Sequence, residues 1–381
     1  MRILHTSDWH VGKVLKGQSR VDDQIAALAQ LVDVARAERP DLVIVAGDLY
    51  DNAAPTPDAT RIVTRALSAL RSTGAAVVAI GGNHDNGPAL DALRSWADAA
   101  GITLRGTVRD RPDDHLIAGD TADGEPWRLV ALPFLSQRYA VRATELFDLT
   151  AAEANQTYAD HVGRLLSRLI AGFDAGEAVN LVTAHLTVIG GKTGGGERDA
   201  HTILGYAVPA TVFPAAAHYV ALGHLHRPQQ VLGPCPVRYS GSPLAIDFGE
   251  EENATSVSIV EVTATTPAKV REVPITAGTP LRTVRGTLAQ LSTLDTGNAW
   301  LRAYVSEAPR AGLREEVQAL LPRALEVRVD PALVAPIDVA PRAQRSGRSP
   351  RDLFAEYLAR RGHADEATVA LFDRLHAEVT T

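Results

Sequence analysis

The sequence of 381 residues contains a single cysteine and no long apolar run. Cys235 cannot form a disulfide within one chain, so stability must come from a buried core, and a reducing cytoplasm fits this composition best. The first residues enter a strand pattern at once, without the apolar stretch of a secretory signal or a membrane span. We therefore expect a cytoplasmic protein.

Positive charge and aromatic side chains are also scarce. The formal net charge is −7, and aromatic residues make up 5% of the chain. This argues against nucleic-acid binding through overall charge, because neutralising phosphates requires clustered Lys and Arg, and it gives little support for a base-stacking surface. It does not exclude a nucleic-acid enzyme, since net charge does not describe local patches and bound metal neutralises carboxylates.

The sequence does contain an alternation of short apolar runs and helical patterns. Helical spacing is found from Ile25 to Ala35 and from Pro57 to Leu70. Buried strands are predicted at Ile3–Thr6, Leu42–Ala46, Val77–Ile80, Leu129–Leu132, Leu181–Ala184 and Tyr219–Leu222. The alternation predicts α/β layering, and the length suggests two or three domains. The five glycines between Gly190 and Gly196 predict a mobile loop.

The pattern changes from about Val270. Apolar runs from there to Val329 predict a small mixed α/β module, and Pro331–Arg351 is typical of a linker with a basic end. Ser349 can cap a helix that has Pro350 at its first position. Apolar faces are formed in this helix by Leu353, Phe354, Tyr357 and Leu358, and in a second helix by Val369, Phe372, Leu375 and Val379. The predicted domains are 1–269, 270–335, a linker at 336–348, and helices at 349–381.

Polar motifs follow five of the predicted strands. They are Asp8-Trp9-His10, Gly47-Asp48, Gly82-Asn83-His84-Asp85, Ala184-His185 and Gly223-His224-Leu225-His226. The carboxyl ends of strands form the ligand crevice of open α/β sheets, so these side chains are expected to meet at one rim. Oxygen and imidazole donors without thiolate suit Mn, Fe or Zn rather than a structural zinc cage. Residues spaced i, i+2 in extended chain point to one side, so two of these motifs each offer two donors.

Each motif alone is weak evidence. A Gly-Asp pair after a strand is more often a turn, and a lone buried histidine is more often a core residue. Occurring together in this order, they predict a metal-dependent phosphoesterase with a two-metal site built from Asp8, His10, Asp48, Asn83, His185, His224 and His226. Asp48 is the natural bridging carboxylate, and two ions about 3.5–4 Å apart can clamp the attacking and leaving oxygens of a phosphate.

At these residues the sequence resembles the calcineurin-like metallophosphoesterase superfamily and, within it, the SbcD-type DNA nuclease subunits, the bacterial counterparts of the eukaryotic double-strand-break repair nuclease. The segments His5–Gly12 and Ala46–Asp51 are typical of that branch. The resemblance covers nearly the whole chain, strongly to about Gly249 and weakly beyond. It implies an α/β (α+β) fold, a four-layer β-sandwich flanked by helices, with a small α/β capping domain and C-terminal helices.

The resemblance also implies roles for single residues. Asp8, His10 and His226 would hold a first metal, Asn83, His185 and His224 a second, and Asp48 would bridge them, with Mn²⁺ as the expected ion and Mg²⁺ or another divalent ion as the alternative. His84 would contact the scissile phosphate and protonate the leaving oxygen, and Asp85 would orient it. Alternatively, His84 is a third metal ligand or a turn residue, and Asp85 is a helix N-cap, which is compatible with an orienting role.

Asp51 departs from some relatives, which have a second catalytic histidine three residues after the bridging aspartate. A carboxylate cannot supply a cation there, and SbcD-like sequences commonly have Asp at this position. Our interpretation is that Asp51 caps a loop.

For activity and partners, the resemblance implies a Mn-dependent nuclease, with exonuclease action on duplex ends and endonuclease action on single strands and hairpins. It would act in DNA repair, replication and recombination, as a cytoplasmic, nucleoid-associated homodimer with the SMC-like ATPase SbcC. The module at 270–335 would cap the DNA, with Arg271, Arg282, Arg285 and Arg302 as DNA contacts or as solvated surface. The C-terminal helices would dock on the ATPase coiled-coil base or pack back on their own domain.

Two other functions are considered. A small-molecule phosphodiesterase of the same superfamily would need neither the capping module nor the docking helices. A non-catalytic scaffold with this fold would usually have lost metal ligands, whereas all seven are present here.

Overall fold

The computed structural model describes residues 1–109, 111–136, 151–173, 176–197, 207–333, 349–360 and 365–380. The chain divides into two compact units, Met1–Arg328 and Val329–Thr381. The linker expected at 336–348 lies outside the described residues. Among the helices of the described part, none combines the length and the apolar character needed to cross a membrane.

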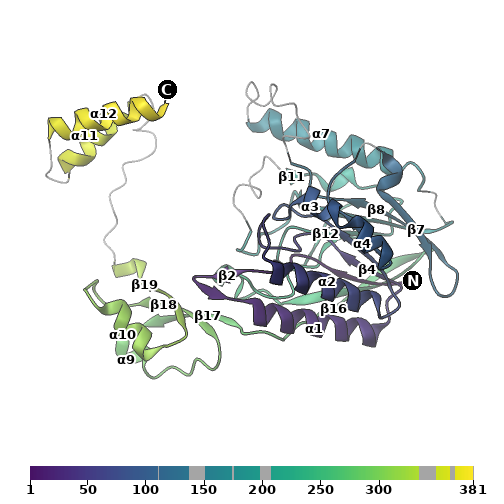
Figure 1. Cartoon of the computed structure of the whole chain (residues 1–381), viewed down its shortest axis with the longest axis horizontal. Coiled ribbons are helices and arrows are strands. Elements are labelled where there is room, and N and C mark those ends of the chain that lie inside the picture. Colours follow the sequence, from purple (N-terminus) through teal and green to yellow (C-terminus); the bar gives the residue numbers. More distant parts are fainter. Residues whose placement is uncertain are drawn as a thin grey trace. The chain divides into compact units, whose positions relative to one another are not determined.

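The first of two six-stranded sheets contains the strands at the beginning of the chain (Figure 1). The order across the sheet is β16-β15-β1-β4-β5-β6. The last four strands of this order are parallel, and β15 and β16 are added as antiparallel neighbours. The bounds are β1 (Arg2–Thr6), β4 (Leu42–Val45), β5 (Ala76–Ile80), β6 (Ile102–Arg105), β15 (Ser256–Thr263) and β16 (Thr266–Pro274).

The second sheet also has four parallel strands and is formed by strands from the middle of the chain. Its order is β13-β14-β12-β9-β8-β7, with four parallel strands at the centre and an antiparallel strand at each edge. The bounds are β7 (Leu116–Asp120), β8 (Pro126–Leu132), β9 (Val179–His185), β12 (Tyr219–Gly223), β13 (Gln229–Val231) and β14 (Val237–Tyr239). Both sheets therefore present the carboxyl ends of several parallel strands.

Helices cover the outer faces of the two sheets, so the first unit has four layers (Figure 1). On the first sheet lie α1 (Val21–Glu38), α2 (Pro57–Arg71), α3 (Gly87–Ala92) and α4 (Arg94–Ala99), and on the second lies α7 (Ala151–Leu169). The alternation of side chains explains why the central strands are apolar throughout. In β4, for example, Val43 and Val45 pack under the helices, whereas Leu42 and Ile44 pack against the second sheet.

The fold expected from the sequence is confirmed in these layers. Each fully buried Leu, Ile or Val side chain contributes about 1.5–3 kcal/mol, so the face-to-face packing of the two sheets is a major source of stability. α2 begins as its sequence predicts, because the hydroxyl of Thr56 accepts a hydrogen bond from the Ala59 amide and Pro57 occupies the first helical position.

The small module consists of a three-stranded sheet with two short helices. Its elements are β17 (Leu281–Gly286), α9 (Leu288–Leu291), β18 (Trp300–Val305), α10 (Leu313–Leu320) and β19 (Ala324–Val329). The boundary expected at 270 falls inside β16, which pairs with β15 as far as Pro274, and Ile275 is buried in the main core. Val270–Pro274 therefore belongs to the first sheet, and Ile275 to the core that this sheet shares with the helices. The sequence suggested otherwise because β16 is a mostly exposed edge strand with a weak apolar pattern.

The second unit contains two helices, α11 (Pro350–Arg360) and α12 (Glu366–Thr380). Ser349 caps α11 as predicted, since its hydroxyl accepts from the Asp352 amide at 3.2 Å and its own amide donates to the Asp352 carboxylate at 3.2 Å. The rings of Phe354 and Phe372 stack at 4.3 Å, while Tyr357 is 52% exposed. The two helices thus contact each other and still expose apolar side chains to solvent.

Candidate metal centre

The predicted site residues lie where strands from both sheets end. Asp8 and Asp48 follow β1 and β4, Asn83 follows β5, His185 is the last residue of β9, and His224 follows β12 directly. Most of these side chains and their neighbours are buried, and Asn83 is half-buried. The buried ones are Asp8, His10, Asp48, His84, His185, His224 and His226. All seven predicted metal ligands are therefore delivered to one edge.

The backbone leaves the strands through sharp turns that point these side chains inward. Asp8, His10 and Asp48 have φ values of 54°, 46° and 51°, in the left-handed region that costs most residues about 1 kcal/mol or more. Hydrogen bonds between the two segments compensate: the Asp8 amide donates to the Gly47 carbonyl and the His10 amide to the Asp48 carbonyl, each at 3.0 Å. The loops after β1 and β4 thus form one scaffold.

Gly47 allows an imidazole to approach the backbone closely. Its φ is 96°, and a Cβ atom there would overlap with Nδ1 of His185. That nitrogen is 2.8 Å from the Ala46 carbonyl oxygen. Because a carbonyl oxygen only accepts, Nδ1 carries the hydrogen, and Nε2 is left with the lone pair that a metal needs.

The donor atoms form interlocking groups, in each of which they lie within 4.8 Å of one another. The groups are Asp8, His10 and His226; His10, Asp48 and His84; and Asp48, His185 and His224. The Nε2 atoms of His10 and His226 are 3.1 Å apart. Two bare imidazole nitrogens repel at this distance, so either a proton or a cation must lie between them. The arrangement fits a metal ion.

Asn83 and Asp48 complete the arrangement. The Asn83 Oδ1 atom is 2.8 Å from His185 Nε2 and 2.7 Å from His224 Nδ1. Asp48 Oδ2 lies 3.6 Å from His10 Nε2 and 3.4 Å from His185 Nε2, so the carboxylate stands between the two sets of histidines. This is the position that a bridging ligand requires.

The electrostatics of the cluster favour a cation. Burial opposes the charge of Asp48, but His185 and His10 outweigh it and hold its pKa well below the usual range. Burial alone would lower the pKa of His185 and of His226, yet Asp48 raises the first to about 9 and Glu250 raises the second to about 10. Sites that bind protons so strongly also attract divalent ions, which displace those protons.

Sequence reasoning missed two carboxylates behind His226. Glu250 Oε1 is 2.5 Å from His226 Nδ1, and Glu197 Oε1 accepts from the His226 amide at 2.9 Å. Glu250 lies 24 residues from the histidine and has no spacing that would reveal the contact. Glu197 is only weakly indicated by the sequence: it follows a run of glycines, and its carboxylate can accept hydrogen bonds from their amides.

The glycine run, for which the composition predicted a mobile loop, makes several hydrogen bonds in the structure. The amides of Gly194 and Gly195 donate to the Glu197 carboxylate at 2.6 and 2.8 Å. Both backbone groups of Lys192 bind the side chain of Gln229. The glycines serve close packing here: a Cβ on Gly196 would overlap with the Glu250 carboxylate.

The role expected for Asp85 requires correction. Its carboxylate accepts from the backbone amides of Leu49, Tyr50 and Gly82, at 3.1, 2.9 and 2.8 Å. Asp85 is the chain neighbour of His84, but the ring of that histidine is oriented through Nδ1, 2.7 Å from the carbonyl oxygen of Asp51. Asp85 therefore ties the loops after β4 and β5 together. It does not orient His84, because the side chains of adjacent residues in a turn point in different directions.

We expect Asp85→Asn to lower the free energy of unfolding of the metal-free protein by about 1–3 kcal/mol, because an amide leaves at least one of the three buried N–H groups without an acceptor. Urea denaturation measures the change. Asp113→Asn, at an exposed site, is the control and should alter stability little. An Asp85→Asn variant as stable as the wild type would show that these contacts do not fasten the loops.

Asp51 makes contacts other than the loop cap that its position suggested. Its carbonyl oxygen orients His84, and its carboxylate lies 3.2 Å from the Lys13 ammonium and 3.8 Å from His10 Nδ1. Lys13 is 21% exposed at the side chain, so a positive charge stands at the rim of the cluster.

Comparison with known proteins places these motifs in a family. Residues 1–104 match the family model of calcineurin-like phosphoesterases. A protein of Bacillus subtilis (strain 168) is 34% identical over 325 residues, which cover 83% of this chain and 81% of the relative. One of Rhodobacter capsulatus is 35% identical over 297 residues, 74% of this chain and 71% of the relative. Both are named as the D subunit of the nuclease SbcCD.

The chain belongs to this SbcD family. It is therefore a nuclease-family member of the calcineurin-like phosphoesterases, with a divalent-metal site. Two solved structures are also similar: TT1561 of Thermus thermophilus (13% identity, TM-score 0.43, 72% of this chain and 98% of that one) and a dimetal phosphatase from Danio rerio (14%, 0.46, 73% and 97%). At such TM-scores neither likeness bears on function.

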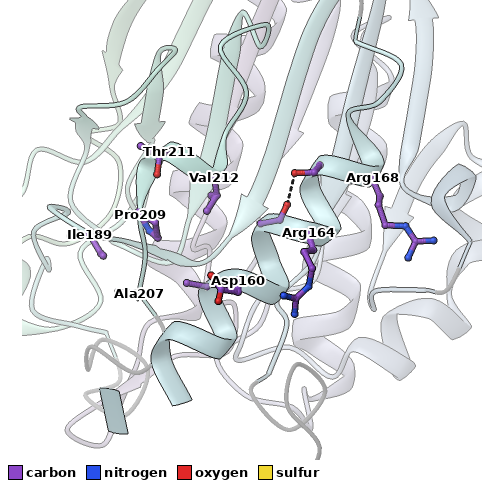
Figure 2. A pocket seen from close by; sticks show the side chains of 11 residues that line it. Asp160, Arg164, Arg168, Ile189, Ala207, Pro209, Thr211 and Val212 are labelled. Carbon is purple, nitrogen blue, oxygen red and sulfur yellow. Dashed lines mark hydrogen bonds between the residues drawn. The ribbon is translucent and has the colours of Figure 1, made fainter. Parts of the chain in front are cut away.

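A separate groove of about 920 Å³ lies between α7 and the segment around β11 (Ala207–Val208). Figure 2 shows Asp160, Arg164 and Arg168 of α7 on one wall. None of the candidate site residues lines this groove. The groove is therefore separate from the cluster of donor groups at the buried strand ends.

Proposed function

We propose that the chain is a Mn²⁺-dependent DNA nuclease whose active centre holds two divalent ions. The convergence of donor groups from two sheets at one buried edge carries the proposal. When bound, such a pair lowers the pKa of a water molecule and neutralises charge on the phosphate. The donors suit Mn²⁺, with Mg²⁺ or another divalent ion as the alternative. The proposed ligands are Asp8, His10 and His226 for one ion and Asn83, His185 and His224 for the other, with Asp48 bridging.

His84 carries out the chain's own proton transfer in this proposal. Its Nδ1 donates to the Asp51 carbonyl oxygen at 2.7 Å, so the hydrogen on Nδ1 is fixed. The proton given to the leaving oxygen of the cleaved phosphodiester is therefore the one on Nε2. Lys13 supplies the positive charge that Asp51 cannot.

A DNA substrate and a partner subunit SbcC are suggested by the names of the relatives. Both relatives are named as the D subunit of the nuclease SbcCD. We extend this to exonuclease action on duplex ends and endonuclease action on single strands and hairpins, in a cytoplasmic, nucleoid-associated homodimer with an SbcC-type ATPase. Net charge −7 means that binding must rely on local contacts and the metal centre.

The small module is proposed to cap the DNA, and the four arginines considered as DNA contacts all have partners within the chain. Arg271 forms an ion pair with Glu38, and Arg282 donates to the Asp295 carbonyl oxygen. Arg285 and Arg302 lie over aromatic rings. Arg282, Arg285 and Arg302 lie in the module, whereas Arg271 belongs to β16 and joins that strand to α1.

Cleavage assays with Mn²⁺ test the function. Linear duplex and hairpin DNA are compared with bis-p-nitrophenyl phosphate and cyclic nucleotides, with and without the ATPase partner and ATP. We expect cleavage of DNA ends and hairpins. Robust turnover of the small diesters without any DNA cleavage would instead identify a small-molecule phosphodiesterase, and loss of metal binding altogether would indicate a scaffold.

We expect a chain truncated before Ser349 to lose co-purification with an SbcC-type ATPase while it retains Mn²⁺-dependent hydrolysis of bis-p-nitrophenyl phosphate. The second unit presents Tyr357 and Leu371, which are 52% and 45% exposed, and such side chains on a helix pair suit docking in a groove. The full-length double variant Tyr357→Ser, Leu371→Ser keeps the Phe354–Phe372 stack and should also lose the complex. Undiminished co-purification of the truncated chain would reject the docking role.

A further inference from the structure

Glu250 is a buried carboxylate that contacts a proposed metal ligand but has no role in the proposed chemistry. Its side chain is 1% exposed and both oxygens are engaged. Oε1 lies 2.5 Å from His226 Nδ1, and Oε2 accepts from the Ile246 amide at 2.8 Å. The carboxylate is thus fixed on both sides.

This contact sets which nitrogen of His226 faces the other donors. A carboxylate only accepts, so Nδ1 carries the hydrogen and the lone pair is on Nε2. That Nε2 atom is the one 3.1 Å from His10 Nε2, inside the group that contains Asp8. The backbone amide of His226 donates a hydrogen bond to the Glu197 carboxylate at 2.9 Å. Ring and backbone are therefore held by separate carboxylates.

The turn that contains Glu250 is braced from its other side by the small module. This turn, Phe248–Glu250, places the Phe248 ring among Leu15 and Leu281, the latter in β17. The Arg302 guanidinium of β18 lies 5.2 Å from the Phe248 ring centre and donates to the Phe248 carbonyl oxygen at 3.3 Å. A shift of the module would thus be felt two residues away, at Glu250.

We propose that Glu250 is a positioning residue that fixes the His226 ring for the first metal ion, and that the small module supports it through Phe248. The inference rests on the proposed two-metal centre. It links the module to the chemistry by a defined chain of contacts, from Arg302 through Phe248 and Glu250 to His226.

Metal titration tests the positioning role directly. In Glu250→Gln, the amide has one oxygen for two donors, so it cannot serve both His226 Nδ1 and the Ile246 amide. We expect one of the two Mn²⁺ equivalents to bind 10–100-fold more weakly by calorimetry, the scale for a lost partner of a ligating histidine, and the other to be unchanged. The electron paramagnetic resonance signal of a coupled Mn²⁺ pair should give way to that of single ions at limiting metal. The neighbouring exposed Glu251→Gln is the matched control.

Arg302→Met tests the brace and should weaken the same equivalent several-fold. Its control is Arg310→Met in the same module, because Arg310 pairs with Glu316 on the exposed surface, away from Phe248. Wild-type affinity for both equivalents in Glu250→Gln would overturn the positioning role, and if that variant does not fold, unchanged affinity in Arg302→Met would overturn the proposal. A wild-type chain that binds no Mn²⁺ would instead refute the proposed function.

Discussion

Asp48→Asn is expected to reduce Mn²⁺-dependent hydrolysis of both DNA and bis-p-nitrophenyl phosphate by about 10³-fold or more. Asp48 Oδ2 stands between His10 and His185, at 3.6 and 3.4 Å from their Nε2 atoms. A neutral amide cannot bridge two cations, and losing several kcal/mol of charge stabilisation at about 1.4 kcal/mol per tenfold gives this magnitude. Metal titration should show fewer than two tightly bound ions.

Asparagine is a sharper choice than alanine at this position. The His84 amide donates a hydrogen bond to Asp48 Oδ1 at 2.8 Å, and the Oδ1 atom of an asparagine can accept the same bond. Asparagine also tolerates the φ of 51° found at this position. The fold should therefore persist, as thermal unfolding of the metal-free protein would show. Asp33→Asn on the exposed surface of α1 is the control. Two Mn²⁺ ions bound with wild-type affinity, together with full activity, would mean that Asp48 is not the bridge.

Much of this centre could be predicted from the sequence because its information is local. The central strands are apolar on both faces, so their ends were visible, and parallel strands deliver the residues just beyond them to one edge. Asp8, Asp48, Asn83, His185 and His224 each lie at the end of such a strand or soon after it, and the structure does bring them together. Their roles as ligands are proposals.

The contacts that could not be predicted join distant segments. Glu250 reaches His226 only because a short turn folds back across the sheet edge, and no local pattern encodes that distance. Adjacency misled in the opposite sense: Asp85 follows His84 in sequence, yet its carboxylate binds three backbone amides. Side-chain direction within a turn is set by backbone angles that composition does not specify.

His84→Gln is expected to slow DNA cleavage by about 10²-fold or more, the usual effect of removing a general acid, without loss of bound Mn²⁺. The measurement has two parts, because the donor atoms of His84, His10 and Asp48 are close enough to share one metal ion. If His84 is instead a third metal ligand, the His84→Gln protein should bind one ion fewer. A general acid would leave both ions in place and lose only rate.

The leaving group separates proton transfer from simple phosphate contact. p-Nitrophenolate departs without protonation, whereas the sugar oxygen of DNA needs a proton, so His84→Gln should impair hydrolysis of bis-p-nitrophenyl phosphate far less than cleavage of DNA. Gln can still donate to the Asp51 carbonyl oxygen, which keeps the loop intact. Equal losses on both substrates would assign His84 to phosphate binding. Wild-type rates on DNA would remove it from the mechanism.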